Sequence, residues 1–338
     1  MQGNDIDISI VIVSYKTPRL LKDCLQSIID TTTQLIYEII VIDNDSGDES
    51  EELIKTHFPQ VKWINSGYNA GFSRANNLGF RNAMGTYTLI LNPDTTLKEG
   101  FLRQLLSFYL NQNEIFKNKL GFLTTRIISS TDQSLLIGTG RKFVGFRKEM
   151  NKNPFVIFFK RMFRLNPVKY DPYVQHYLNH EVDFVSGACF LIKTSTLKEN
   201  DLFFDEDFFL YFEDLELCFR TKQIGLRNYF CGDLELFHVN SASTSQSKSR
   251  NEQIKISEYL FYNKRFNRLQ FNLLGYLIQF NLFLNMNLLK RKKEFEQIEL
   301  LHLERELFNT YYFHLDKHLN KGNQQMKSFL KYDQKVKI

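Results

Sequence analysis

Short apolar runs alternate with helical repeats through the first 120 residues, and this alternation constrains the fold more than any other feature. The continuous apolar run from Ile8 to Val13 predicts a buried strand, and apolar residues then return after Pro18 at the spacing of a one-sided helix. Ser46 and Glu49 have the spacing of a capping box that begins a later helix. Strands that alternate with helices form βαβ units. We therefore predict an α/β fold with a mostly parallel central sheet.

The same signals predict how the chain is divided. They continue to about residue 240, with two short strands near Leu226–Phe230 and Leu234–Phe237, and they fail only between residues 130 and 180. There the composition becomes basic and aromatic, and residues 141–169 contain nine basic side chains and one acidic side chain. We interpret this stretch as an excursion from a single domain of residues 1–240. Residues 241–338 predict a helical extension with a loose basic tail.

Composition excludes several classes of protein. A net charge of +5 is too small to indicate nucleic-acid binding. The four cysteines lack the spacing of a zinc site, so we expect buried thiols in a reducing compartment. The first residues lack the features of a signal peptide, which favours a cytoplasmic protein. Residues 269–289 approach membrane-spanning length, but six Asn and Gln side chains interrupt them, so we expect this helix to lie on a bilayer or pack on protein.

Polar residues follow two of the predicted strands where each strand ends. Ser14 and Tyr15 come after the first strand, and Asp43 and Asp45 come at the end of the second. Ligands of doubly wound sheets bind outside the carboxyl ends of the strands, so these side chains are expected to face the crevice. Asp43 would there accept a hydrogen bond from the ring N–H of uracil or thymine. The alternative is that Asp43 and Asp45 only cap a turn and a helix.

The segment from Leu89 to Leu97 suggests how a diphosphate is held. The chain has neither a GxGxxG motif nor a P-loop, so a bound cation is needed instead. An apolar strand leads directly into Asn92, Pro93 and Asp94. The Asp94 carboxylate is a hard oxygen ligand suited to Mg²⁺ or Mn²⁺, which bind substrate phosphates while keeping some waters. An ordinary turn is the alternative.

Several short segments, in their order and spacing, resemble glycosyltransferase family 2 and in particular its bacterial rhamnosyltransferase-like branch. The segments are SYK, IDNDSGD, NSGYNAGFSRANN, LNPD, FVSGACFLI and FLYFEDLELCFR, followed by an isolated His before a polar loop. The resemblance covers roughly residues 8–240. It implies a fold of the GT-A type, which is one nucleotide-binding α/β domain whose second half builds the acceptor site.

The resemblance also implies roles for residues of the first half of the chain. The expected nucleotide site comprises Ser14, Tyr15, Asp43, Asp45, Gly71, Asn76 and Asn92. Asn92-Pro93-Asp94 matches the DXD-type metal motif of the family, with an asparagine in place of the first carboxylate. Asp94 is then the carboxylate ligand of the metal. His238 matches a histidine that completes metal or diphosphate binding, and a purely structural histidine is the alternative.

The second half of the chain is expected to carry the base and the sugar site. Glu213 and Asp214 open a predicted helix, whose dipole stabilises the ionised form that a base needs, and they match the ED motif of the family. We favour Asp214 as the base, with Glu213 as the close second. Gly187 and Ala188 match positions under the acceptor or donor sugar, with close strand packing as the alternative. Arg220 is expected to contact an acidic side chain of the cleft, a phosphate of the substrate, or solvent.

The predicted function is an inverting, metal-dependent transfer. A sugar would move from a nucleotide diphosphate donor, with UDP or dTDP favoured, to a hydroxyl of a glycan or lipid-linked glycan in cell-surface polysaccharide synthesis. The alternatives are a nucleotidyltransferase, a glycoside hydrolase and a non-catalytic binding protein of the same fold. The basic, Phe-rich residues 141–169 and the long apolar helix suggest peripheral contact with an anionic membrane. A homodimer through the C-terminal helices is the competing expectation.

Overall fold

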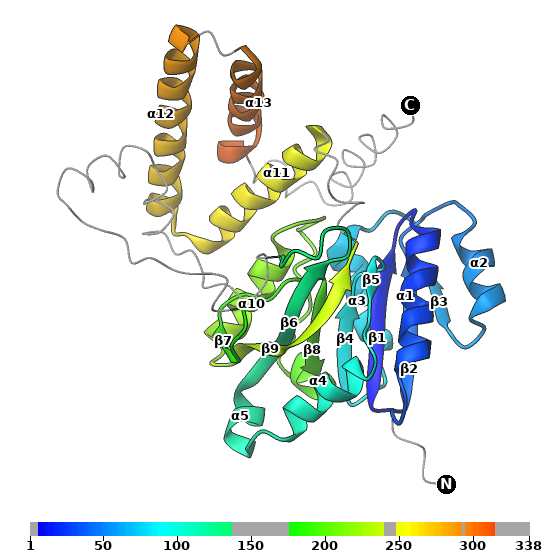
Figure 1. Ribbon diagram of the computed structural model, residues 1–338. Helices are drawn as coiled ribbons and strands as arrows, with labels where there is room; N and C mark the ends of the chain where they lie inside the picture. The colour runs from blue at the N-terminus through cyan, green and yellow to red at the C-terminus, as the bar shows by residue number, and fades with distance from the viewer. Residues whose placement is uncertain (1–5, 137–175, 240–247, 293–294, 315–338) are drawn as a thin grey trace. The chain divides into compact units, whose positions relative to one another are not determined.

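The computed structural model describes residues 6–136, 176–239, 248–292 and 295–314 (Figure 1). The chain divides into two compact units. The first comprises Met1–Phe143 with Asp171–Gln246, and the second comprises Val144–Tyr170 with Ser247–Ile338. Most of the predicted basic excursion and all of the predicted loose tail lie outside the described residues.

The first unit is built on one nine-stranded sheet in the order β3-β2-β1-β4-β8-β6-β9-β5, with β7 paired to β9. Its parallel half consists of β1 (Ile8–Ser14), β2 (Tyr37–Asp43), β3 (Lys62–Asn65) and β4 (Tyr87–Leu91). The other half consists of β5 (Thr95–Thr96), β6 (Leu120–Ser129), β7 (His180–Val182), β8 (Cys189–Lys193) and β9 (Arg227–His238). Strands β6 and β9 continue the parallel direction, while β5, β7 and β8 run against it.

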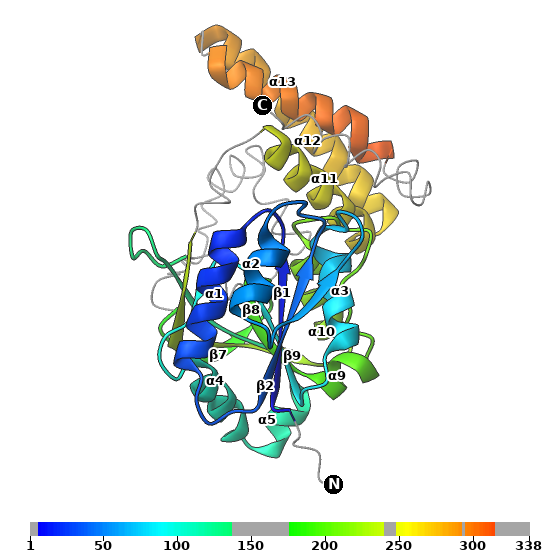
Figure 2. The ribbon, with the colours of Figure 1, turned by 90° about the vertical axis from the view of Figure 1, so that its right-hand side faces the viewer.

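Helices cover both faces of this sheet (Figure 2). One face is covered by α1 (Pro18–Thr31), α2 (Ser50–His57) and α4 (Phe101–Leu110), with the short α5 (Glu114–Lys119) beside them. The opposite face is covered by α3 (Gly71–Asn82), α9 (Thr194–Glu199) and α10 (Glu213–Gln223). Strands covered on both faces are largely apolar, and every residue from Ile8 to Ile12 is fully buried, including Ser9, whose hydroxyl donates to Glu38 at 2.5 Å. The prediction of an α/β fold with a mostly parallel central sheet is confirmed.

Two local expectations were wrong. The strands expected near Leu226–Phe230 and Leu234–Phe237 are one strand, β9, because a register shift opposite Thr125 and Arg126 absorbs the polar residues between them. No capping box forms at Ser46, since α2 begins only at Ser50. Ser46 instead receives a hydrogen bond from the backbone N–H of Lys16 on its Oγ.

The second unit is a helical assembly with an aromatic core. It contains α11 (Lys248–Arg265), α12 (Arg268–Lys292), α13 (Phe295–Tyr311) and the 3₁₀ helix η1 (Tyr312–His314). The ring of Tyr312 stacks on that of Phe271 with centroids 4.3 Å apart, and its hydroxyl donates to the Phe271 carbonyl at 2.7 Å. A Cβ at Gly275 would lie 2.4 Å from the Tyr312 ring, so only glycine permits this contact. Among the described residues, no helix is both long and apolar enough to span a bilayer.

Candidate active site at the carboxyl ends of the strands

The expected nucleotide site begins where β1 and β2 end, with Ser14 opposite Asp43 in parallel register. Asp43 is largely buried, and this burial raises the pKa of its carboxyl group, against the effect of hydrogen bonds from Ser46. The backbone N–H of Ser46 donates to Asp43 Oδ1 at 3.3 Å. Ser14 is fully buried with its Oγ 3.3 Å from Thr17 Oγ1. Its hydroxyl therefore faces the turn that leads into α1, and its expected contact with a base or ribose stays a prediction.

The turns after β1 and β2 carry the next two expected residues, Tyr15 and Asp45. Tyr15 is partly exposed and Asp45 is exposed, so both are accessible at this edge. Asp45 and Lys16 adopt left-handed backbone conformations, with φ of 65° and 55°. Such conformations are uncommon for residues other than glycine and cluster at ligand sites.

Asn44 and Asn69 form a link that the sequence analysis missed. Asn44 Nδ2 donates to Asn69 Oδ1 at 2.8 Å, and Asn44 Oδ1 accepts from the backbone N–H of Ala70 at 2.7 Å. Both side chains are buried. Together they attach the turn after β2 to the start of α3. The only local signal for this link was an asparagine directly after a strand, and its partner lies 25 residues away.

Gly71 and Asn76 pack against protein instead of lining an open crevice. Gly71 has φ +75°, and a Cβ there would lie 2.5 Å from the carbonyl oxygen of Phe209. The backbone N–H of Phe72 donates to the same oxygen at 2.7 Å. Asn76 is 1% exposed and its Nδ2 donates to the Phe72 carbonyl at 2.9 Å. Asn76 Oδ1 is buried without a hydrogen-bond partner in the described part of the chain, so the expected nucleotide contact of Asn76 stays a prediction, while Gly71 packs against the loop that leads to α10.

The two expected metal ligands lie side by side. Thr95 pairs with His238 in the register between β5 and β9, which places the neighbouring Asp94 next to the histidine. Asp94 Oδ1 lies 3.1 Å from His238 Nε2, and Asn92 Nδ2 lies 3.3 Å from the same nitrogen. Both Asp94 and His238 are about nine-tenths buried. Residues 144 positions apart in the sequence, 94 and 238, therefore meet at the exit of β4.

This pair fits a six-coordinate divalent cation. Neighbouring ligands of an octahedral ion with bonds of about 2.1 Å lie about 3 Å apart, close to the observed Asp94–His238 separation. Within the described ranges, no group of three or more His, Cys, Asp or Glu side chains could hold a metal. Asp94 and His238 would thus supply only part of the coordination. Such a partial set is typical of Mg²⁺ and related ions that also bind waters and substrate phosphates.

Gly187 and Ala188 connect the metal pair to the expected base. The Ala188 carbonyl accepts from the backbone N–H of Asn92 at 3.0 Å, and the backbone N–H of Gly187 donates to Asp214 Oδ2 at 3.0 Å. Asp214 Oδ1 accepts from the backbone N–H of Leu215 at 2.8 Å. The carboxylate is partly exposed and held by backbone donors on both oxygens. These hydrogen bonds fix the orientation of the Asp214 carboxylate toward the loop that carries Gly187.

Glu213 differs sharply from its neighbour. It is 5% exposed, and its Oε2 has no hydrogen-bond partner within the described part of the chain. Burial, and secondarily the charge of Asp214, raise the pKa of Glu213 well above its ordinary range. Immediately before it, Tyr211 and Phe212 both adopt left-handed conformations, with φ of 69° and 66°. Each such residue costs about 1–3 kcal/mol, so surrounding contacts must hold this loop.

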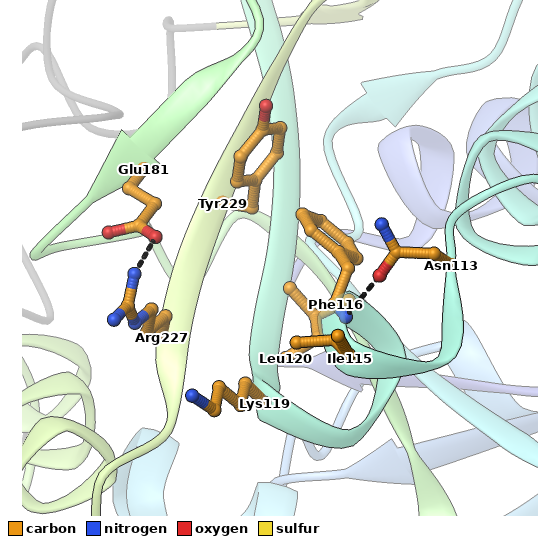
Figure 3. A pocket seen from close by; sticks show the side chains of 8 residues that line it. All are labelled: Asn113, Ile115, Phe116, Lys119, Leu120, Glu181, Arg227 and Tyr229. Atoms are coloured by element: carbon orange, nitrogen blue, oxygen red, sulfur yellow. Dashed lines mark hydrogen bonds and ion pairs between the residues drawn. The ribbon is translucent and has the colours of Figure 1, made fainter.

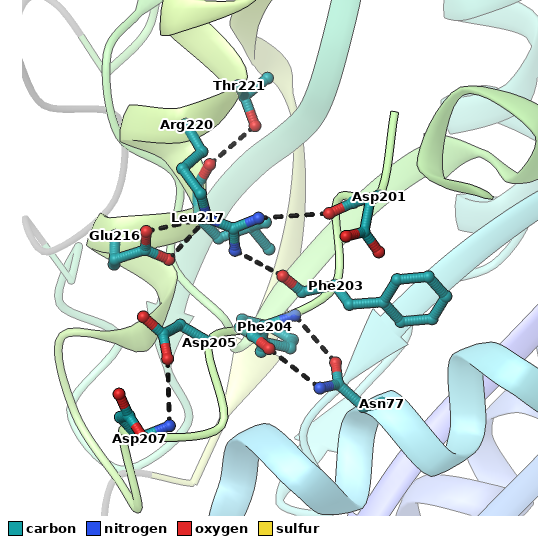
Figure 4. Close-up of polar contacts among 10 residues, drawn as sticks. All are labelled: Asn77, Asp201, Phe203, Phe204, Asp205, Asp207, Glu216, Leu217, Arg220 and Thr221. Atoms are coloured by element: carbon teal, nitrogen blue, oxygen red, sulfur yellow. Dashed lines mark hydrogen bonds and ion pairs between the residues drawn. The ribbon is translucent and has the colours of Figure 1, made fainter. Parts of the chain in front are cut away.

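Two polar side chains hold the loop between α9 and α10 (Figure 4). Asn77 of α3 donates to the Phe204 carbonyl at 2.9 Å and accepts from the Phe204 N–H at 2.8 Å. Arg220 pairs with Glu216 at 2.8 Å and also donates to the Phe203 carbonyl. The partner of Arg220 is thus Glu216, a largely buried acid of its own helix, so that of the three expected partners an acid is the one observed.

A cavity of about 250 Å³ lies elsewhere in the first unit (Figure 3). It is lined by Asn113, Ile115, Phe116, Lys119, Leu120, Glu181, Arg227 and Tyr229. Leu120 and Arg227 begin β6 and β9, whereas His238 ends β9. The cavity therefore lies at the opposite end of these strands and adds nothing to the candidate active site.

Comparison with known proteins connects this geometry to a family. The family model described as glycosyl transferase family 2 matches residues 9–200. The low-salt glycan biosynthesis hexosyltransferase Agl10 of Haloferax volcanii is 24% identical over 284 residues, which cover 80% of this chain and 82% of that protein. The rhamnosyltransferase WbbL of Escherichia coli is 26% identical over 239 residues, covering 68% of this chain and 83% of that protein.

Solved structures share the fold at low identity. A structure of GalNAc-T7 with UDP, GalNAc and Mn²⁺ matches 77% of this chain with a TM-score of 0.53 and 17% identity, and this chain spans 50% of its length. Residues 1–349 of S. aureus TarS, in complex with UDP-GlcNAc, match 81% of this chain with a TM-score of 0.50 and 14% identity, and 72% of that chain is covered. At these identities the likeness concerns the fold alone.

Proposed function

This chain belongs to glycosyltransferase family 2 and is a glycosyltransferase, and on that premise we propose that it catalyses an inverting, metal-dependent transfer with Asp214 as the base. By their names, Agl10 is a hexosyltransferase of glycan biosynthesis and WbbL is a rhamnosyltransferase. The donor would be a sugar nucleotide with a diphosphate, and the acceptor a hydroxyl of a glycan or lipid-linked glycan.

One observation carries the proposal, namely the short hydrogen-bonded path from the Asp94–His238 pair to Asp214. Asn92 contacts His238 with its side chain and Ala188 with its backbone, and Gly187 then donates to Asp214. A base and a cation site that serve one displacement must lie on either side of one sugar. The path joins them through the segments that follow β4 and precede β8, which are neighbouring strands of the sheet.

Asp94 and His238 would hold the divalent cation. When bound, this ion neutralises the charge that develops on the leaving diphosphate. Asn92, 3.3 Å from His238, orients the imidazole. Asp43 would hold the nucleobase of the donor at the exit of β2. Its largely buried carboxylate favours a nucleobase that donates a ring N–H, as uracil and thymine do.

Asp214 would receive the proton of the acceptor hydroxyl. As this proton moves to the carboxylate, the acceptor oxygen forms a bond to the anomeric carbon on the face opposite the diphosphate. The bond from that carbon to the phosphate oxygen breaks, so the configuration inverts. A positioned base contributes about 10²–10⁴-fold to the rate.

The structure supports Asp214 over Glu213 for this role. Asp214 is partly exposed and its two oxygens accept backbone hydrogen bonds, which orient the carboxylate. Glu213 is buried, and burial raises its pKa, which disfavours the ionised form that a base needs. We infer that Glu213 fills the space behind the base.

Binding and transfer measurements on the same variants test these assignments. Titration calorimetry with UDP and dTDP should show tighter binding when Mn²⁺ is present, and Asp94→Ala should abolish that increase. Asp214→Asn should bind the nucleotide normally but transfer about 100-fold more slowly or worse. Asp30→Asn, which changes an exposed acid of α1, serves as the control and should behave as wild type.

Three results would contradict the proposal. Equal nucleotide affinity with and without Mn²⁺ would remove the metal role of Asp94 and His238. Normal transfer by Asp214→Asn would remove the base assignment. A product with retained anomeric configuration in NMR spectra would exclude a single displacement.

A further inference from the structure

An apolar stripe runs along one exposed face of α12 in the second unit. We define this α12 stripe as Leu269, Leu273, Tyr276, Phe280 and Phe283, which follow one another in steps of four and three residues. Such steps keep side chains on one side of a helix. These five side chains are between 44% and 79% exposed. Phe313 of η1, itself 41% exposed, adds to the stripe through a ring contact with Tyr276 at 5.7 Å.

The core of the second unit does not account for these residues, because other positions of α12 make that core. Phe271, Leu274, Leu282 and Met286 are buried in the described helices. Taking about 200 Å² for a large aromatic side chain, the exposed parts of the aromatic residues alone present roughly 400 Å². With Leu269 and Leu273 added, the patch reaches the size that marks an interaction surface on soluble proteins.

The charge around the α12 stripe points to the chemistry of its partner. Residues 259–293 include seven basic residues and no acidic residue. The basic residues are Lys264, Arg265, Arg268, Lys290, Arg291, Lys292 and Lys293, so they flank the stripe in sequence at both of its ends. Between residues 269 and 289 the chain carries no charge at all.

We propose that the α12 stripe binds the surface of an anionic lipid bilayer, with the helix lying in the plane of the interface. Leucine and aromatic side chains then enter the boundary of the acyl chains, while the basic residues meet lipid phosphates. None of the helices that the structure describes, α12 included, has the combined length and apolar character of a membrane-crossing segment.

A second copy of the chain is a poorer partner for the same surface. Pairing two α12 stripes, in either direction, brings basic ends of the two helices together without an acidic residue from this segment to oppose them. Like charges across an interface disfavour association. An anionic bilayer satisfies both the apolar stripe and the positive charge, so the two features favour lipid over self-association.

Vesicle flotation of the full chain tests the proposal without using its activity. Wild type should float with vesicles of three parts phosphatidylcholine to one part phosphatidylglycerol, and less with phosphatidylcholine alone. Raising the salt from about 0.1 M to 1 M shortens the screening length from about 10 Å to 3 Å and should weaken the binding. The double variant Phe280→Ser with Phe283→Ser should bind about tenfold more weakly or worse, because both aromatic anchors are lost.

A matched control removes exposed apolar side chains from the first unit. Met84→Ser with Ile115→Ser changes residues that are 68% and 72% exposed and should leave flotation unchanged. Circular dichroism should show all variants folded, since every substituted residue is exposed. Wild type that fails to float, or a stripe variant that floats as wild type does, overturns the proposal. It is also overturned if light scattering shows a dimer that only the stripe variant dissociates, because the partner would then be a second copy.

Discussion

Substituting Gly71 by alanine tests whether the start of α3 holds the loop that carries the base. Gly71 has φ +75°, a conformation that costs a residue with a Cβ about 1–2 kcal/mol. The new Cβ would also lie 2.5 Å from the Phe209 carbonyl oxygen, a backbone atom that must move away. That movement breaks the 2.7 Å hydrogen bond from Phe72, worth about 1 kcal/mol. The free energy of unfolding should fall by about 2–3 kcal/mol in total.

Gly225→Ala is the matched control, because it introduces the same kind of backbone strain without a contact like the one between residue 71 and Phe209. Gly225 has φ +85°, but a Cβ there would meet nothing within 4 Å. Thermal unfolding should therefore show a loss for Gly71→Ala that exceeds the loss for Gly225→Ala, by roughly 2–4 °C for each kcal/mol of difference. Transfer, measured by nucleotide release at a temperature where both variants are folded, should fall only for Gly71→Ala. Equal melting temperatures with equal turnover would refute the proposed role of this contact.

Three further substitutions have expected outcomes. Asn77→Ala removes the two hydrogen bonds to the Phe204 backbone, so it should lower kcat more than it changes donor affinity. If Asn77 is only structural, the variant should instead yield less folded enzyme with unchanged kcat. Glu213→Gln should become more stable than wild type as the pH rises above about 4.5, because the Glu213 carboxyl, whose pKa is raised in the folded protein, ionises more readily in the unfolded chain and so destabilises the wild-type fold. A difference in melting temperature that does not change with pH would contradict this. His238→Ala should weaken Mn²⁺-dependent nucleotide binding less than Asp94→Ala does, as measured by calorimetry, and an equal or larger loss would reverse the ranking of the two ligands.

The sequence predicts the strand-exit residues well because local rules govern them. An apolar strand followed by Asp94 places that carboxylate at the edge of a parallel sheet, whatever the rest of the chain does. The residues that were misjudged depend on distant partners. Gly71 meets Phe209, which lies 138 positions later, and nothing near either residue indicates the contact. Arg220 differs, because its partner is local: of the expected cleft acid, phosphate or solvent, the structure shows an acid, Glu216, one turn earlier on the same helix, which an (i, i+4) pairing rule would have singled out.

The short pairing between β5 and β9 has a consequence for the order of folding. Strand β9 is the last strand of the sheet to leave the ribosome, and it must enter between β6 on one side and β5 with β7 on the other. Asp94 is made long before, but His238 reaches it only when the end of β9 has paired with β5. The proposed cation site is therefore assembled last, and a nascent chain stopped before residue 227 contains Asp94 without its partner. Metal-dependent nucleotide binding would appear only in molecules whose sheet is complete.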